Sequence, residues 1–68
     1  MLILTVERRR RGLTQAALSR LTGVHPSDIS KLESGRVPAY PAWRSAIAKA
    51  LGVAEGELFM EVDDEPPR

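Results

Sequence analysis

The sequence lacks cysteine altogether, and its 68 residues include a single histidine, His25, and only three aromatic side chains. The absence of cysteine excludes disulfides and thiolate metal sites. One histidine does not make a metal site unless several carboxylates converge on it, so neither a metal nor a cofactor is expected. Long apolar runs are also missing: the stretch Met1–Val6 is interrupted by Thr5 and is followed by positive charges, which fits neither a membrane span nor a signal peptide. The chain is therefore expected to be soluble and cytoplasmic, with no membrane partner.

This length allows a single small domain. A chain of this size buries only about 60% of the surface that its unfolded form exposes. Without disulfides or metals, association with a second copy is the expected additional source of stability. Apolar residues near the two ends of the chain are the candidates for this homodimer interface: Met1, Leu2, Ile3, Leu58, Met60 and Val62.

The charged residues are distributed unevenly, although the net charge is only +1. Residues 1–50 hold nine basic and three acidic side chains, whereas residues 51–68 hold six acidic side chains and one basic one. The positive excess in the first fifty residues favours a polyanionic partner. Residues 63–68 contain three acidic side chains and two prolines, so we expect a disordered tail after a domain spanning residues 1–62. An acidic tail of this kind suits a basic protein partner or the chain's own basic surface.

Helix signals dominate the chain. Thr14 suits an N-cap, and Pro26 suits the first turn of the next helix, where Asp28 is expected to supply the capping that His25 provides poorly. A strand over Met1–Val6 is the alternative to the first helix. The helices expected in this all-α fold are Leu2 or Ile3 to Arg11, Gln15–Thr22, Pro26–Ser34, Pro41–Leu51 and Ala54–Met60. The expected core residues are Leu18, Leu21, Ile29, Leu32, Trp43, Ile47, Leu51 and Phe59.

Two of the expected helices, Gln15–Thr22 and Pro26–Ser34, are joined by a short segment around Gly23. Such a compact pair is the geometry of a helix-turn-helix, which offers its second helix to the major groove of DNA. On a helical wheel, Ile29 and Leu32 face the core. The opposite face of the second helix is short, polar and partly cationic, which suits a groove about 12 Å wide. Its members are Ser27, Asp28, Ser30, Lys31 and Ser34.

Residues 4–59 resemble the Cro and phage-repressor helix-turn-helix family, also called the xenobiotic-response-element type. The matching signature is R-x-x-x-G-L-T-Q-x-x-L over Arg8–Leu18, G-V at Gly23-Val24, I-S-x-L-E-x-G over Ile29–Gly35 and I-A-x-A-L-G-V over Ile47–Val53. The resemblance implies a compact five-helix lambda-repressor-like fold with the helix-turn-helix at its second and third helices. It also implies a recognition helix at Pro26–Ser34 and binding as a homodimer to a two-fold site on double-stranded DNA.

The resemblance also implies roles for particular residues. Gln15 corresponds to a residue that contacts a DNA phosphate, and Arg8 corresponds to an arginine that pairs with the residue at Glu33. The corresponding base-contacting residues are Pro26, Ser27, Asp28 and Lys31, although Pro26 has no donor and can touch only a thymine methyl group. Further phosphate contacts are expected from Thr14, Ser30, Ser34 and Arg36. The arginines at 9–11 are interpreted either as phosphate contacts or as a solvated run of charge.

No arrangement of residues in the sequence supports catalysis, so we do not expect an enzyme. The sequence predicts a sequence-specific transcriptional regulator of double-stranded DNA, most simply a repressor. The alternative is a protein-interaction module, such as an antitoxin-type partner binder, that keeps this fold with little or no DNA role. Asp28 on the recognition helix and the acidic tail are the features that favour the alternative.

Overall fold

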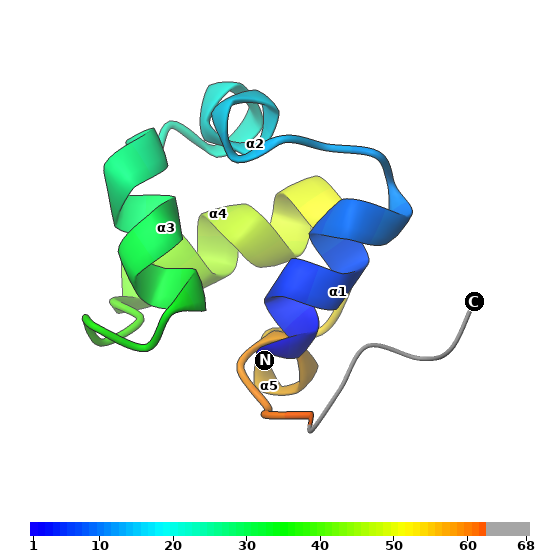
Figure 1. The fold of residues 1–68 in the computed structure, drawn as a ribbon, viewed down its shortest axis with the longest axis vertical. Coiled ribbons are helices and arrows are strands. Elements are labelled where there is room, and N and C mark those ends of the chain that lie inside the picture. Colours follow the sequence, from blue (N-terminus) through cyan, green and yellow to red (C-terminus); the bar gives the residue numbers. More distant parts are fainter. Residues whose placement is uncertain (63–68) are drawn as a thin grey trace.

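Five helices account for the architecture in the computed structural model, which describes residues 1–62 (Figure 1). The prediction of an all-α, five-helix fold is confirmed, and the helix ends lie within a few residues of the expected positions. The predicted tail at residues 63–68 lies outside the described residues. The helices are α1 (Ile3–Arg10), α2 (Gln15–Thr22), α3 (Pro26–Glu33), α4 (Pro41–Leu51) and α5 (Glu55–Leu58).

The N-terminal segment is helical, so the alternative of a strand over Met1–Val6 is wrong. Leu2 is the N-cap of α1, and its extended backbone takes part only in an isolated antiparallel bridge with Glu61. The backbone N–H of Ile3 donates to the carbonyl of Met60 at 3.0 Å, and that of Val62 donates to the carbonyl of Met1 at 2.8 Å. These bonds join the start of α1 to the segment after α5, beside which α1 lies (Figure 1).

The core lies where the five helices meet, with α2 packed against both α3 and α4. Apolar side chains from every helix, and one from the turn before α3, are almost completely buried there. They are Leu4, Leu18, Val24, Ile29, Leu32, Ile47, Leu51 and Leu58. Trp43 and Phe59, which the sequence predicts as core residues, are partly buried and pack against this cluster.

Leu21 is the clear error among the predicted core residues, because 60% of its surface is exposed. The short helix α2 buries one narrow face, on which Leu18 is fully enclosed. Val24 then returns from the turn into the core, only 4% exposed. Leu21, three positions after Leu18, is left on the outer side of α2. Leu58 is fully buried as well, so it belongs to the core and not to an exposed apolar surface at the chain ends.

Candidate nucleic-acid interface

The turn between α2 and α3 is fixed by local hydrogen bonds. Thr14 begins α2 as an N-cap, its hydroxyl oxygen accepting from the N–H of Ala17 at 3.0 Å. Gly23 ends α2 with φ at +78°, a left-handed conformation that costs a residue with a Cβ about 1 kcal/mol or more. The Thr22 hydroxyl then accepts from the N–H of Val24 at 3.1 Å. The conformation of the turn is therefore fixed by Gly23 and by the Thr22 hydroxyl, neither of which lies on the outer face of α3.

The N-terminus of α3 is capped by His25, which corrects the prediction that Asp28 would supply this cap. The Nδ1 atom of His25 accepts from the N–H of Ser27 at 3.1 Å, and the Ser27 hydroxyl lies 2.7 Å from the same nitrogen. The ring nitrogen of His25 thus accepts from a backbone N–H in the first turn of the helix, which is the role that a serine or asparagine side chain usually has at an N-cap. Asp28 lies half-buried in the first turn, where its charge still favours the positive end of the helix.

His25→Ala is expected to lower the free energy of unfolding by about 1 kcal/mol, because it removes the acceptor for an N–H of the first turn. His25→Asn, which keeps a side-chain acceptor, should retain most of the stability. Asp28→Asn tests the sequence-based prediction that Asp28 is the cap of α3. It should lower the free energy of unfolding by less than His25→Ala does. Urea unfolding of the three variants measures these differences, and a larger loss in Asp28→Asn would restore Asp28 as the cap.

The outer face of α3 carries exposed polar side chains. Ile29 and Leu32 are buried beneath it, and the exposed residues are Ser27, Ser30, Lys31 and Ser34. Pro26 and Asp28 are half-buried at its N-terminal end. Within residues 1–62 the ammonium group of Lys31 makes no ion pair or hydrogen bond, so its charge is directed to solvent. The face thus presents one cation and several hydroxyl groups on a ridge that the rest of the described chain leaves open.

Glu33 connects three helices through one carboxylate. Its Oε2 accepts from Nε of Arg8 at 2.7 Å and its Oε1 from Nη2 at 3.0 Å, a bidentate pair between α3 and α1. The remaining Nη1 of Arg8 donates to the carbonyl of Leu13 at 2.7 Å. Both side chains are nearly buried, with 10% of Arg8 and 8% of Glu33 exposed. The structure therefore brings together the two residues that the family resemblance pairs.

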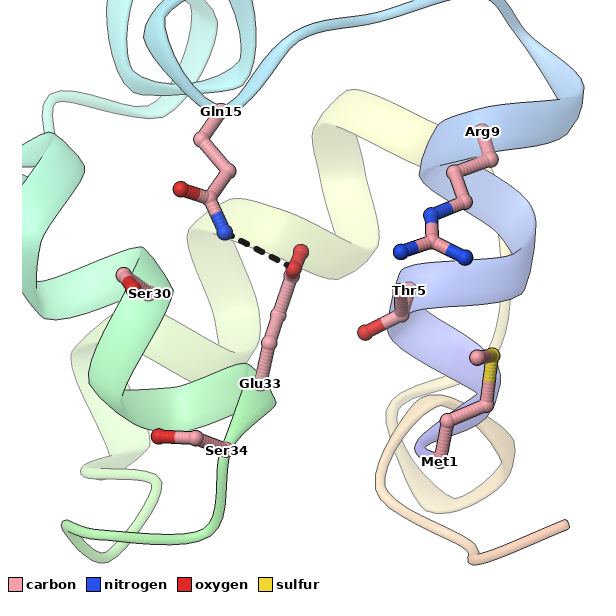
Figure 2. Close-up of a pocket in the computed structure, with 7 residues that line it drawn as sticks. All are labelled: Met1, Thr5, Arg9, Gln15, Ser30, Glu33 and Ser34. Atoms are coloured by element: carbon pink, nitrogen blue, oxygen red, sulfur yellow. Dashed lines mark hydrogen bonds between the residues drawn. The ribbon is translucent and has the colours of Figure 1, made fainter. Parts of the chain in front are cut away.

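Gln15 joins this network in a way that the sequence did not indicate. Its Nε2 donates to Oε1 of Glu33 at 3.0 Å, as the dashed line in Figure 2 marks. An amide nitrogen carries two N–H groups, so one of them remains for an acceptor outside the protein. Gln15 thus occupies the start of α2, where the helix dipole favours an anion, while its amide group is held in one orientation by Glu33.

The other residues expected to contact phosphates differ in whether their side-chain donors are already used in hydrogen bonds within the protein. Thr14 uses its oxygen as an acceptor and keeps its O–H for an external partner. Arg36 is exposed in the segment after α3 and makes no side-chain hydrogen bond within residues 1–62. Ser30 is likewise exposed. The Ser34 hydroxyl donates to the carbonyl of Lys31 at 3.1 Å, which occupies its only proton.

The arginine run is divided among different faces of α1. Arg11 donates to the carbonyl of Leu51 at 2.8 Å and also bonds Glu7. Arg10 is exposed and lies 3.3 Å from a carboxylate oxygen of Glu7. The hydrogen bond from Arg11, with the charge of Arg10, lowers the pKa of the Glu7 carboxyl. Arg11 is thus engaged in the fold, whereas Arg9 lines a hollow beside α3.

This hollow, of about 290 Å³, separates α1 from α3 (Figure 2). Both helices contribute hydroxyl groups, and α1 adds a guanidinium group. The lining residues are Met1, Thr5, Arg9, Gln15, Ser30, Glu33 and Ser34. Sequence reasoning missed the contribution of Thr5. The available signal was its spacing of four residues from Arg9, which places both on one face of a helix.

Two short helices at a fixed turn, the second with an open polar face, define a small helix-turn-helix domain, the architecture of DNA-binding regulators. The sequence model of the helix-turn-helix domain family matches residues 4–59, and the chain belongs to this family. Comparison with curated proteins and with solved structures gave no significant match. No helix within residues 1–62 has the length and apolar character needed to cross a bilayer, and no group of three or more potential metal ligands gathers there.

Proposed function

We propose that the protein is a sequence-specific, double-stranded DNA-binding transcriptional regulator, a repressor of the Cro and phage-repressor type, that works in the cytoplasm. The observation that carries the proposal is the outer face of α3, where Ser27, Ser30 and Lys31 are exposed above the buried Ile29 and Leu32. Membership of the helix-turn-helix family supports a DNA-binding role for this face.

In the proposed complex, α3 enters the major groove and its N-terminal half reads the bases. Lys31 donates to guanine, Asp28 accepts from a cytosine amine, and Ser27, whose proton is directed at Nδ1 of His25, accepts through its hydroxyl oxygen. Pro26 contributes only an apolar contact. Thr14 and Gln15 at the start of α2, with Arg36 after α3, bind phosphates and set the orientation of the domain. Ser30 adds a hydroxyl donor, whereas Ser34 has only a minor role because its proton is already used.

The proposed active species is a homodimer, with the two α3 helices about 34 Å apart on successive turns of one DNA face. The candidates that remain for the interface are Met60, which is 56% exposed, and the half-buried Met1, Leu2, Ile3 and Val62. Repression would follow if such a dimer occupied a promoter. Light scattering at micromolar concentration tests the dimer, and a mass near one chain of 7.5 kDa would contradict it.

Selection of bound duplexes from a randomised pool at low salt tests the proposed function directly. Enrichment of a two-fold site is the expected result, with an affinity that falls steeply as salt is raised. If no duplex is enriched, the DNA-binding proposal is wrong. The same protein should then be tested as the antitoxin-type interaction module, since it would retain the fold without the DNA role.

Lys31→Ala is expected to relax the preference at one base position of the selected site by about 1–3 kcal/mol, because a donor to a base edge is lost. Lys49→Ala is the matched control: it removes the same charge from an exposed position on α4. Competition binding with every single-base variant of the site measures the change. Equal effects of the two substitutions at all positions would mean that Lys31 reads no base.

A further inference from the structure

The hydrogen bond between the side chains of His25 and Ser27 has a definite direction. Nδ1 of His25 lies 2.7 Å from the Ser27 hydroxyl oxygen, and the backbone N–H of Ser27 donates to the same nitrogen at 3.1 Å. Because that N–H points at Nδ1, the nitrogen carries no hydrogen of its own, and the neutral ring holds its proton on Nε2. The hydrogen between the ring and the hydroxyl group therefore belongs to Ser27.

This direction leaves the Ser27 hydroxyl group with only acceptor capacity for an external partner. A hydroxyl group has one hydrogen and two lone pairs, and the hydrogen of Ser27 is used in the bond to Nδ1 of His25. In the major groove, the amino groups of cytosine and adenine donate to such an oxygen. The polar groups that guanine and thymine present there are acceptors, and a hydroxyl group without a free hydrogen does not satisfy them.

Protonation of His25 reverses the direction of this hydrogen bond. The imidazolium form carries hydrogens on both ring nitrogens, so Nδ1 becomes a donor to the Ser27 oxygen. The hydroxyl hydrogen of Ser27 is then free for an acceptor on DNA. Histidine is the side chain that ordinarily changes charge between about pH 5 and 8, and His25 is the only histidine in the sequence. A pH change in this range therefore acts on the Ser27 hydroxyl through one ring.

No charged side chain in the described part of the chain pairs with the His25 ring. The charged residues of α2 and α3, which meet at the turn, and of α4, which packs against α2, are Arg20, Asp28, Lys31, Glu33, Arg44 and Lys49. Asp28 lies in the first turn of α3 but makes no hydrogen bond with the ring, and Glu33 is bound by Arg8 and Gln15. The ring is exposed, so it exchanges its proton with the solvent.

We propose that His25 is a positioning residue for base recognition. It determines whether the Ser27 hydroxyl group accepts from DNA or donates to it, and its protonation makes the base preference at that position depend on pH. The inference rests on the proposed function, in which the exposed Ser27 meets a base from the N-terminal half of α3. His25 needs no DNA contact of its own, because it acts through the direction of the Ser27 hydroxyl hydrogen.

Competition binding at two pH values tests the proposal with the site selected from the randomised pool. Ser27→Ala first identifies the base position that Ser27 reads, which is the position where this variant loses its preference. At about pH 7.5 the wild-type protein should favour adenine or cytosine there by about fivefold, the value of one net hydrogen bond. At about pH 5.5 this preference should disappear or change to guanine or thymine, while the preferences at the other positions remain.

His25→Asn is the matched control variant. Its Oδ1 atom accepts from the N–H and hydroxyl groups of Ser27 as Nδ1 does, but an amide takes up no proton in this pH range. The variant should therefore show the same preference at both pH values. His25→Ala leaves the Ser27 hydroxyl group free to rotate, so the preference should be weaker at both. A purely structural role of His25 as a helix cap would not make the preference at one base position depend on pH.

The protonation state of the ring can also be measured without DNA. Because His25 is the only histidine, nitrogen NMR spectra of the free protein report its two ring nitrogens without ambiguity. The neutral ring is expected to carry its proton on Nε2, and a hydrogen on Nδ1 is expected to appear as the pH is lowered. A neutral ring with its proton on Nδ1 would overturn the inference, whatever the protein binds.

The binding experiments distinguish failure of this inference from failure of the proposed function. If Ser27→Ala loses no preference at any position of the selected site, or if the preference at its position is the same at both pH values, the role of His25 is wrong and the proposed function remains. A gain in affinity at low pH that is equal for every base is an effect of charge alone and also overturns this role. If the wild-type protein enriches no duplex, the proposed function is wrong, and base recognition by Ser27 is wrong with it.

Discussion

Glu33→Ala is expected to lower the free energy of unfolding by about 3–5 kcal/mol, far more than the loss of an exposed ion pair on this domain would cost. The change leaves the guanidinium group of Arg8 nearly buried without its carboxylate partner, and it leaves the amide of Gln15 without its acceptor. A domain of this size has a total stability of only about 3–10 kcal/mol. Much of the variant population should therefore be unfolded at ambient temperature.

Two control variants distinguish the effect of burial at Glu33 from the effect of losing a negative charge. Glu33→Gln keeps the shape and one acceptor, so it should cost less than Glu33→Ala. Glu7→Gln removes another carboxylate that binds arginine, but Glu7 pairs with exposed side chains on the surface of α1, and such pairs contribute about 1 kcal/mol or less. Guanidinium denaturation followed by circular dichroism measures all three. Similar losses for Glu7→Gln and Glu33→Ala would contradict the importance of burial.

Leu18→Ala is expected to lower the free energy of unfolding by about 2–5 kcal/mol, because it leaves a cavity at a fully buried position. Leu21→Ala provides a close comparison in the same helix, with the same chemical change three residues further on. It should change stability by about 0.5 kcal/mol at most, because 60% of the Leu21 surface is already exposed to water.

Thermal and urea unfolding of the two leucine variants give the comparison directly. If Leu21→Ala costs as much as Leu18→Ala, then Leu21 is buried in solution, either within the domain or in contact with a second copy. A mass measurement at the same concentration distinguishes these two explanations.

The sequence predicted the elements of the fold well because their signals are local. The hydroxyl of Thr14 and the ring of Pro26 mark helix starts, and Gly23 marks a helix end, through interactions within a few residues. The buried residues of α3 are also predictable, since Ile29 and Leu32 follow helical spacing. Such signals do not depend on how the helices pack.

The errors concern features that depend on neighbours or on unusual chemistry. Leu21 fits the helical pattern, but the pattern does not state that Val24 fills the adjacent part of the core. His25 is a rare cap, so the sequence does not point to its ring nitrogen as the acceptor. The hollow beside Thr5 exists only because α1 and α3 lie at a particular separation. That separation depends on how the helices pack, which local sequence patterns do not determine.

The link between α1, α2 and α3 through the Glu33 carboxylate has a consequence for how such a protein changes over generations. The side chains that join α3 to α1 and α2 lie on its inner side, whereas the ammonium group of Lys31 on the outer face makes no hydrogen bond or ion pair with the described residues. If α3 reads DNA as proposed, a substitution at Lys31 would alter the preferred site with little effect on folding stability. Under that proposal, a new binding preference would need only one or two replacements on that outer surface, and the underlying scaffold would remain unchanged.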